Sequence, residues 1–192
     1  YLSRAQEQGQ RLEALVQGLL DLSRIESAET MANFEPVNLT KLLGEIVEPY
    51  ASRAEQSNRT LELDLPTDRI EVSGTETLLR QAFENLLENA LKFTRPNDFI
   101  RIATESDMEW VSIKIIDSGI GIPTDDLPRI FSRFHRGRNV SKISGNGLGL
   151  AIVKAIITLH GGTVDVQSQS ARGTTITVSL PSSIANPINI SE

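Results

Sequence analysis

The feature that most constrains this chain is a helical repeat of apolar residues between positions 78 and 91. At 3.6 residues per turn the repeat predicts a helix with one broad core-packing face: Leu78, Leu79, Ala82, Phe83, Leu86, Leu87, Ala90 and Leu91. Along one edge of this face, Asn85, Asn89 and Lys92 follow at i, i+4 and i+7. Amide oxygens suit a hard cation such as magnesium and an ammonium suits phosphate. Taken alone, the same row also fits a solvated helix surface.

Length and composition restrict the class of protein. With 192 residues and 39% hydrophobic content, the chain can form one main domain and a small accessory element. Its net charge of -6 and pI near 5.1 disfavour binding to nucleic acid or to an anionic membrane surface. The absence of cysteine excludes disulfides and thiolate zinc sites. No run approaches the roughly 18 apolar residues of a spanning helix, so we expect a soluble chain.

The first 27 residues differ from the rest. Apolar residues recur at spacings of three and four, and further leucines widen the stripe: Leu2, Ala5, Gly9, Leu12, Leu15, Val16, Leu19, Leu20, Leu22 and Ile25. Such a helix belongs in a bundle, yet no matching helix precedes it. We therefore expect either a fragment of a longer protein or a chain that dimerises here. The alternative is a helix folded back on the main domain.

The remaining chain alternates helical and strand patterns. Residues 34–38 predict an irregular linker, Asn38 can cap a helix that begins at Leu39, and Pro49 predicts a kink or an early end of that helix. Strand periodicity appears in 61–65, 70–72, 100–103, 111–116, 164–166 and 176–180, with helices starting at Thr75 and spanning 150–160. The pattern predicts an α+β fold, an α/β two-layer sandwich with mainly antiparallel strands, followed by a loose tail at 182–192.

A carboxylate stands at the end of one predicted strand, in the stretch Asp117-Ser118-Gly119-Ile120-Gly121-Ile122-Pro123. The glycines allow a tight turn after the strand. A buried Asp117 could accept a hydrogen bond from an exocyclic amine of a base, and losing such a contact costs about 1–3 kcal/mol. By itself, Asp-Ser-Gly is also a common turn.

A glycine-rich loop, Gly145-Asn146-Gly147-Leu148-Gly149-Leu150, runs directly into the helix predicted at 150–160. Free backbone N–H groups and the positive end of the helix dipole make such a junction a natural phosphate site. The loop lacks the Gly-Lys-Ser/Thr of a Walker A motif and the preceding strand of a dinucleotide fingerprint. A basic segment, 129–138, could cover phosphates with Arg136 and Lys142; for Arg138 and Lys142 a solvated charged loop fits equally well.

Four motifs together resemble the N, G1, F and G2 boxes of bacterial sensor histidine kinases, in that order. They are Asn85-x-x-x-Asn89-x-x-Lys92, Asp117-x-Gly119-x-Gly121, Phe131-x-x-Phe134 and Gly145-x-Gly147-x-Gly149. Residues 19–27 also resemble the end of the second helix of the family's dimerisation and phosphotransfer domain. The resemblance implies the Bergerat ATP-binding fold at 39–181, preceded by that helix at 1–30 and a linker at 31–38, with a flexible tail at 182–192.

The resemblance further implies ATP and Mg²⁺ as cofactors. Asn89, with Asn85 nearby, would hold the metal; Lys92 and Arg136 would contact phosphates; Asp117 would bind the adenine amine. Asn85, Lys92 and Arg136 would be the catalytic residues. The full nucleotide-binding set would be Asn85, Asn89, Lys92, Asp117, Gly119, Gly121, Ile122, Phe131, Arg136, Gly145, Gly147, Leu148, Gly149 and Thr174.

The same resemblance favours a kinase over an ATPase. Hydrolytic relatives carry a glutamate at the position of Asn85, and Glu84 lies about 100° away round the helix. The family's phosphoacceptor histidine lies on a helix that this chain does not contain, and neither His135 nor His160 has its setting. We therefore expect no self-phosphorylation of this chain. The resemblance also implies a homodimer through the N-terminal helix bundle in the full protein, a response regulator as partner, and a cytoplasmic location with a membrane reached only through parts outside this chain. A nucleotide-sensing module without catalysis and a serine kinase of the anti-sigma type remain alternatives.

Overall fold

The computed structural model describes residues 9, 16–18, 20, 25, 34–138 and 145–183. The elements follow in the order β1 (Glu35–Asn38), α2 (Leu39–Gln56), β2 (Thr60–Asp64), β3 (Glu71–Gly74), α3 (Glu76–Phe93), β4 (Phe99–Ser106), β5 (Trp110–Asp117), the 3-10 helix η2 (Thr124–Arg129), α4 (Gly149–Leu159), β6 (Thr163–Ser168) and β7 (Thr174–Pro181).

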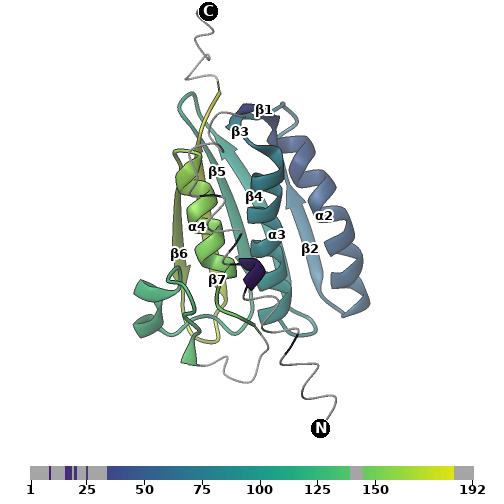
Figure 1. Cartoon of the computed structure of the whole chain (residues 1–192). Coiled ribbons are helices and arrows are strands. Elements are labelled where there is room, and N and C mark those ends of the chain that lie inside the picture. Colours follow the sequence, from purple (N-terminus) through teal and green to yellow (C-terminus); the bar gives the residue numbers. More distant parts are fainter. Residues whose placement is uncertain are drawn as a thin grey trace, which may run out of the picture.

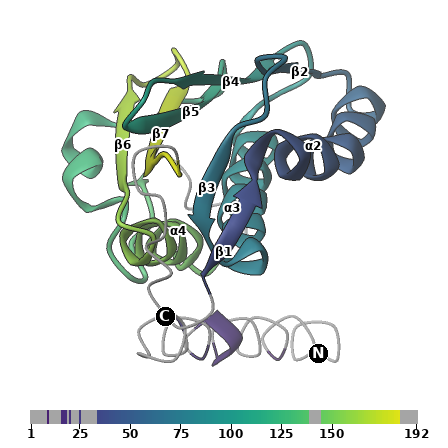
Figure 2. The same ribbon diagram turned by 90° about the horizontal axis from the view of Figure 1, so that it is seen from above.

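Two layers form the domain. One is a five-stranded sheet in the order β2-β4-β5-β7-β6, in which β2 and β4 are parallel and the other neighbours are antiparallel. The other consists of α2, α3 and α4, which cover one face of this sheet (Figures 1 and 2). The predicted α/β two-layer sandwich is therefore confirmed.

The hydrophobic core lies between these layers. Alternate residues of the central strands point toward the helices and are buried, among them Ile100, Ile102, Ile113 and Val178. They meet the apolar face of α3, whose buried residues are Leu79, Ala82, Phe83, Leu86, Leu87, Ala90 and Leu91. Burying a large aliphatic or aromatic side chain contributes about 1.5–3 kcal/mol. This face fixes the rotation of α3 about its axis, and with it the direction in which its polar row points.

Helix α2 begins as predicted but ends later than its proline suggested. The Lys41 amide donates to Asn38 Oδ1 at 3.0 Å, which is the expected N-cap hydrogen bond. Pro49 does not end the helix, which continues to Gln56. A proline removes one backbone hydrogen bond from a helix. Burial of Ile46, Val47 and Ala54 on either side of Pro49 compensates for that loss.

The prediction of an irregular linker is wrong for residues 35–38. They form β1, which pairs antiparallel with β3 and sets Val37 opposite Val72. Val37 is buried and belongs to the core cluster. A strand of four residues with a single buried apolar side chain has no period to detect, and Pro36 is tolerated because β1 lies at the edge of a two-stranded sheet. The division of the chain into a helical part and an ATP-binding domain stays a prediction.

The two residues after β7, Ser182 and Ser183, make contacts with the domain. The amide of Ser182 donates to Glu109 O at 2.8 Å and that of Ser183 to Glu71 O at 3.0 Å, so these two residues are not part of a loose tail. Residues 184–192 of the expected tail lie outside the described residues. Within the described part of the chain, no helix has the length and apolar character needed to cross a membrane.

Candidate functional site

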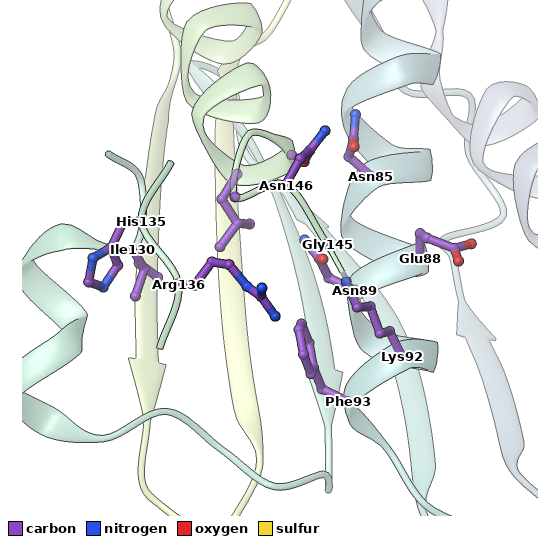
Figure 3. A pocket seen from close by; sticks show the side chains of 13 residues that line it. Asn85, Glu88, Asn89, Lys92, Phe93, Ile130, His135, Arg136, Gly145 and Asn146 are labelled. Carbon is purple, nitrogen blue, oxygen red and sulfur yellow. The ribbon is translucent and has the colours of Figure 1, made fainter. Parts of the chain in front are cut away.

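A cavity of about 600 Å³ lies between α3 and the segments that flank the glycine-rich loop. We call it the main cavity (Figure 3). Its volume falls in the range of small-molecule sites, about 300–1,000 Å³. It is lined by Asn85, Glu88, Asn89, Lys92, Phe93, Ile130, His135, Arg136, Gly145, Asn146, Gly147, Gly149 and Leu150. The structure thus brings together two of the four predicted motifs around one space, the asparagine and lysine row of α3 and the glycine-rich loop, together with Arg136.

The wall formed by α3 carries the predicted polar row. Asn85, Asn89 and Lys92 face the main cavity because the core-packing face of the helix lies beside them. The side-chain amide of Asn85 donates to Gln81 O at 2.9 Å. Its oxygen is directed toward the start of α4, where a Cβ built on Gly149 would lie 3.1 Å from Asn85 Oδ1. The absence of a side chain at Gly149 therefore leaves this amide oxygen accessible.

Two cations converge on the main cavity from opposite walls. Lys92 extends from α3 and Arg136 from the segment after η2, and Figure 3 shows Arg136 pointing toward the α3 wall. Burial lowers the pKa of Lys92, the Arg136 charge lowers it further, and Glu88 acts in the opposite direction. A Cβ on Gly145 would lie 2.5 Å from Lys92 Nζ, so a glycine here lets the ammonium lie against the loop. The electrostatics of the main cavity therefore favour an anion.

Glu88 is a lining residue that the sequence analysis did not identify. Its carboxylate is bound by Arg53 of α2, with Nη1 at 2.9 Å from Oε2 and Nη2 at 3.3 Å from Oε1. In Figure 3 the Glu88 side chain points away from Arg136. Its position one turn before Lys92 was the available signal, but the sequence does not reveal the pairing with Arg53.

An apolar recess of about 90 Å³ continues from the main cavity and contains Asp117. Its lining is Leu86, Asn89, Ala90, Phe93, Ile115, Asp117, Gly121, Ile122, Ile130, Gly137, Leu150, Thr174 and Ile176. The predicted residues Gly121, Ile122 and Thr174 thus lie beside Asp117. Asn89, Phe93, Ile130 and Leu150 line both spaces and connect them.

The carboxylate of Asp117 lies at the end of β5 and has a raised pKa. Burial raises the pKa of Asp117 to about 6, and hydrogen bonds from the backbone amides of Gly119 and Thr174 act against that rise. The Gly119 amide lies 2.9 Å from Asp117 Oδ1. Desolvation penalises the charged form, so a further hydrogen-bond donor in the recess would stabilise the carboxylate.

Three predicted residues lie outside the lining of both spaces. Gly119 acts on Asp117 through its amide instead. Phe131 lies near the Lys154 ammonium, 6.0 Å from the ring centroid to Nζ. Leu148 is fully buried, and a Cβ on Gly18 would lie 2.7 Å from its Cδ1. Lys142, named as a possible phosphate contact, lies outside the described residues.

Several lining residues gave no signal in the sequence. Phe93, Ile130 and Leu150 are apolar and cannot be distinguished from core residues by periodicity. His135 precedes Arg136, and Asn146 accepts the Leu148 amide at 3.1 Å through Oδ1 and so shapes the turn into α4. A polar residue inside a glycine-rich loop entering a helix was the one available hint for Asn146.

The start of α4 adds a positive end to the main cavity. This eleven-residue helix begins at Gly149, and its first residues, Gly149 and Leu150, both line the main cavity. The first turn contains no acidic residue, and no side chain caps it. The partial positive charge of the helix N-terminus therefore acts in the same direction as Lys92 and Arg136.

Carboxylate-rich metal centres are not part of this site. Within the described ranges, no group of three or more histidine, cysteine, aspartate or glutamate side chains could hold a metal ion. Besides the Glu88 carboxylate, which is bound by Arg53, the side-chain oxygens on the α3 wall are those of the Asn85 and Asn89 amides. Mg²⁺ typically binds through few protein ligands together with substrate phosphates and water. These amides therefore fit a metal ion that arrives with a phosphate ligand.

The sheet order, the three covering helices and a cationic cavity beside a buried carboxylate define an ATP-binding domain of the Bergerat type. The chain belongs to the family of histidine kinase-, DNA gyrase B-, and HSP90-like ATPases, whose profile matches residues 74–184.

Individual sequences and structures within this family show more specific similarity to the chain. It is 34% identical over 180 residues to the heme sensor protein HssS of Staphylococcus saprophyticus, covering 94% of this chain and 38% of that protein. The structure of the mycobacterial sensor histidine kinase MprB aligns with a TM-score of 0.70 and 30% identity, over 77% of this chain and 98% of that one. Full-length ShkA in complex with AMPPNP aligns with a TM-score of 0.76 and 28% identity, over 95% of this chain and 38% of that one. The chain thus spans well under half the length of HssS.

Proposed function

We propose that this chain binds ATP with Mg²⁺ and forms the catalytic ATP-binding part of a sensor histidine kinase. It transfers the γ-phosphate to a histidine outside this chain, for relay to an aspartate of a response regulator. The observation that carries the proposal is the convergence of Lys92 and Arg136 on one cavity, next to the N-terminus of α4.

The arrangement of charges matches the two ends of ATP. Burial and the Arg136 charge lower the pKa of Lys92, so an anion placed between the two cations would stabilise the charged form of Lys92, and a triphosphate supplies several negative oxygens. At the other end, Asp117 lies in an apolar recess and can accept a hydrogen bond from the adenine amine. A ligand with a flat apolar base and a polyanionic tail therefore fits both spaces.

Asn89, assisted by Asn85, is the proposed protein ligand of the metal. Both amides line the main cavity on the same helix face as Lys92. When bound, Mg²⁺ neutralises charge on the phosphate oxygens and orients the group that is transferred. Because Asn85, Asn89 and Lys92 all lie on one helix, the chain would hold the metal and the phosphates in fixed positions relative to each other.

The lack of an unengaged acid among the described lining residues of the main cavity favours transfer to a histidine over hydrolysis. Among the described lining residues Glu88 is the only acid, and its carboxylate is engaged by Arg53. The Asn85 amide cannot accept a proton from water. His135 also lines the main cavity, but its ring points toward Asp126 and away from the α3 wall. Among the described lining residues no general base is thus directed at the proposed phosphate position, which favours a nucleophile from another segment, such as an imidazole.

Calorimetric titration tests the metal role of Asn89. We expect Mg²⁺ to raise ATP affinity in the unmodified chain, and Asn89→Ala to remove most of this gain, by about tenfold or 1.4 kcal/mol. Binding of ATP without metal should change little in the variant. Glu84→Ala, on the same helix but outside the lining of the main cavity, is the control and should keep the full magnesium effect.

Two outcomes would contradict this proposal. One is an Asn89→Ala variant with the same magnesium-dependent gain as the unmodified chain. The other is the absence of any heat or thermal stabilisation with millimolar ATP and Mg²⁺.

A further inference from the structure

Asp126 is a buried carboxylate outside the two spaces of the site. It lies in η2, and its side chain is only 1% exposed. A buried charge is unfavourable unless it is paired or hydrogen-bonded. Its partners therefore indicate what this residue stabilises.

Those partners flank the phosphate-facing arginine on both sides. Asp126 Oδ2 accepts the backbone amide of Arg138 at 2.9 Å. Asp126 Oδ1 lies 3.8 Å from His135 Nε2 and 3.6 Å from Arg138 Nε, so these are charge contacts beyond hydrogen-bond distance. The Arg138 amide, followed by the charges of Arg138 and His135, holds the pKa of Asp126 below its ordinary value, so the carboxylate is ionised. One negative charge thus contacts the residue before Arg136 and the residue two positions after it.

The segment held in this way directs Arg136 into the main cavity. In Figure 3 the His135 ring and the Arg136 guanidinium point in opposite directions from adjacent positions, His135 away from Lys92 and Arg136 toward the α3 wall. On its other side the segment is fixed by the Phe134 amide, which donates to Gly147 O at 2.9 Å. With the His135 ring on the side of η2, the next side chain, that of Arg136, points into the main cavity.

We propose that Asp126 is a positioning residue for phosphate binding: it holds the Arg138 backbone and lies against the His135 ring, so that Arg136 between them stays directed into the main cavity. This inference rests on the proposed function, because it takes the phosphates as the ligand of Arg136. Asp126 itself does not line the main cavity. It acts only through the segment that carries Arg136.

The chain supplies a matched control one residue away. Asp125 lies in the same 3-10 helix and accepts from Arg138 Nη2 at 2.8 Å, but its side chain is 79% exposed. Unlike Asp126, it pairs with the side chain of Arg138 and not with the Arg138 backbone amide. Exposed ion pairs contribute little to stability or geometry. Asp125→Asn makes the same chemical change as Asp126→Asn without loosening the backbone.

The test is a double-mutant cycle on nucleotide affinity. Asp126→Asn, Arg136→Ala, their combination and Asp125→Asn are titrated with ATP and, separately, with adenosine. Coupled residues show interaction energies that correspond to about two- to hundredfold in affinity. We expect Asp126→Asn to weaken ATP binding at least about fivefold and to leave adenosine binding unchanged. It should add little in the Arg136→Ala background, while Asp125→Asn should bind ATP like the unmodified chain.

Each contrary outcome has a distinct meaning. Asp126→Asn with normal ATP affinity, with equal losses for ATP and adenosine, or with a loss that adds fully to that of Arg136→Ala overturns the positioning role. Normal ATP affinity of Arg136→Ala alone contradicts the phosphate contact in the proposed function instead. If Asp126→Asn fails to fold, Asp126→Glu keeps the charge and shifts the carboxylate by one methylene. It should show a smaller loss that is again confined to ATP, and equal losses for both ligands would overturn the inference.

Discussion

Burial is the main cause of a shifted pKa at two side chains of this site, Asp117 and Lys92. Burial raises the pKa of the first to about 6 and lowers the pKa of the second. In both cases the charged form is disfavoured until a ligand compensates it. A base amine at Asp117 and phosphates at Lys92 would each provide that compensation, so the two ends of one nucleotide relieve two separate penalties.

The raised pKa of Asp117 leads to a prediction about pH. The carboxylate is ionised above about pH 6 and protonated below it, and a base amine donates best to the ionised form. We therefore expect adenosine affinity to fall as the pH is lowered from 7.5 to 5. Adenosine is the probe because it has no phosphate groups that titrate in this range. Chemical-shift titration by NMR gives the affinity.

The variant Asp117→Asn provides the comparison. It should bind adenosine weakly, by about five- to a hundredfold less for the loss of a buried hydrogen bond of roughly 1–3 kcal/mol, and its affinity should not depend on pH in this range. A steep pH dependence that persists in Asp117→Asn would show that another group is responsible.

Among the elements, the C-terminal end of α4 makes a junction that the sequence did not reveal. His160 is buried, its Nδ1–H donates to Ile156 O at 2.7 Å, and its Nε2 accepts the Thr75 amide at 3.0 Å. Phe34 stacks on the ring with centroids 4.7 Å apart. The end of α4, the start of α3 and the residue before β1 therefore meet on one imidazole. Both ring nitrogens are engaged in structure, which does not suit a phosphoacceptor.

This junction predicts a pH-dependent stability. Burial lowers the pKa of His160, opposed by its hydrogen bond to Ile156 O. The unfolded chain thus binds a proton more readily than the folded one as the pH falls through the ordinary histidine value of about 6.5, and the free energy of unfolding decreases. We expect His160→Gln to lose less stability than the unmodified chain between pH 7.5 and 5.5.

Urea unfolding at a series of pH values measures this difference. Gln can still accept the Thr75 amide but cannot take up a proton. The raised pKa of Asp117 acts in the opposite direction below about pH 6, and it cancels because both proteins contain it. Identical pH slopes for the two proteins would refute the assignment.

At the scale of the whole molecule, the N-terminal segment contacts the domain in its described residues. Ile25 belongs to the hydrophobic core, and Gly18 packs against Leu148 beside the start of α4. Val16 and Leu20 are 50% and 49% exposed. The contacts of Gly18 and Ile25 fit the alternative given in the sequence analysis, a helix folded back on the main domain. A homodimer through this helix in the full protein is a proposal that fits the exposure of Val16 and Leu20.

The surroundings of the two histidines lead to a prediction about phosphorylation of this chain. His160 is buried with both nitrogens bonded, and His135 faces Asp126. We expect no acid-labile phosphate on this chain after incubation with γ-labelled ATP and Mg²⁺. Adding a dimerisation segment that includes the phosphoacceptor histidine should produce labelling of that segment. Labelling of this chain alone would refute the assignment of the acceptor to another segment.

Labelling of the added segment also separates the proposed kinase from its alternatives. A nucleotide-sensing module would bind ATP and leave the added segment unlabelled. A serine kinase of the anti-sigma type would give acid-stable phosphate on a different substrate. The chemical stability of the product therefore distinguishes all three.

The sequence by itself determined the features that depend on local geometry. Helical spacing placed Asn85, Asn89 and Lys92 on one edge of α3, and strand alternation placed Asp117 at the end of β5, because both periods are set by the backbone. The glycine-rich loop likewise predicted the start of α4. These elements and their polar positions follow from neighbours a few residues apart.

Only the tertiary structure decided which distant groups meet. Glu88 is bound by Arg53, β1 pairs with β3, and Asp126 is buried beside His135. Each of these contacts joins segments whose separation in sequence carries no periodic signal. They exist because burying the apolar faces of three helices on one sheet fixes the relative positions of all the loops between them.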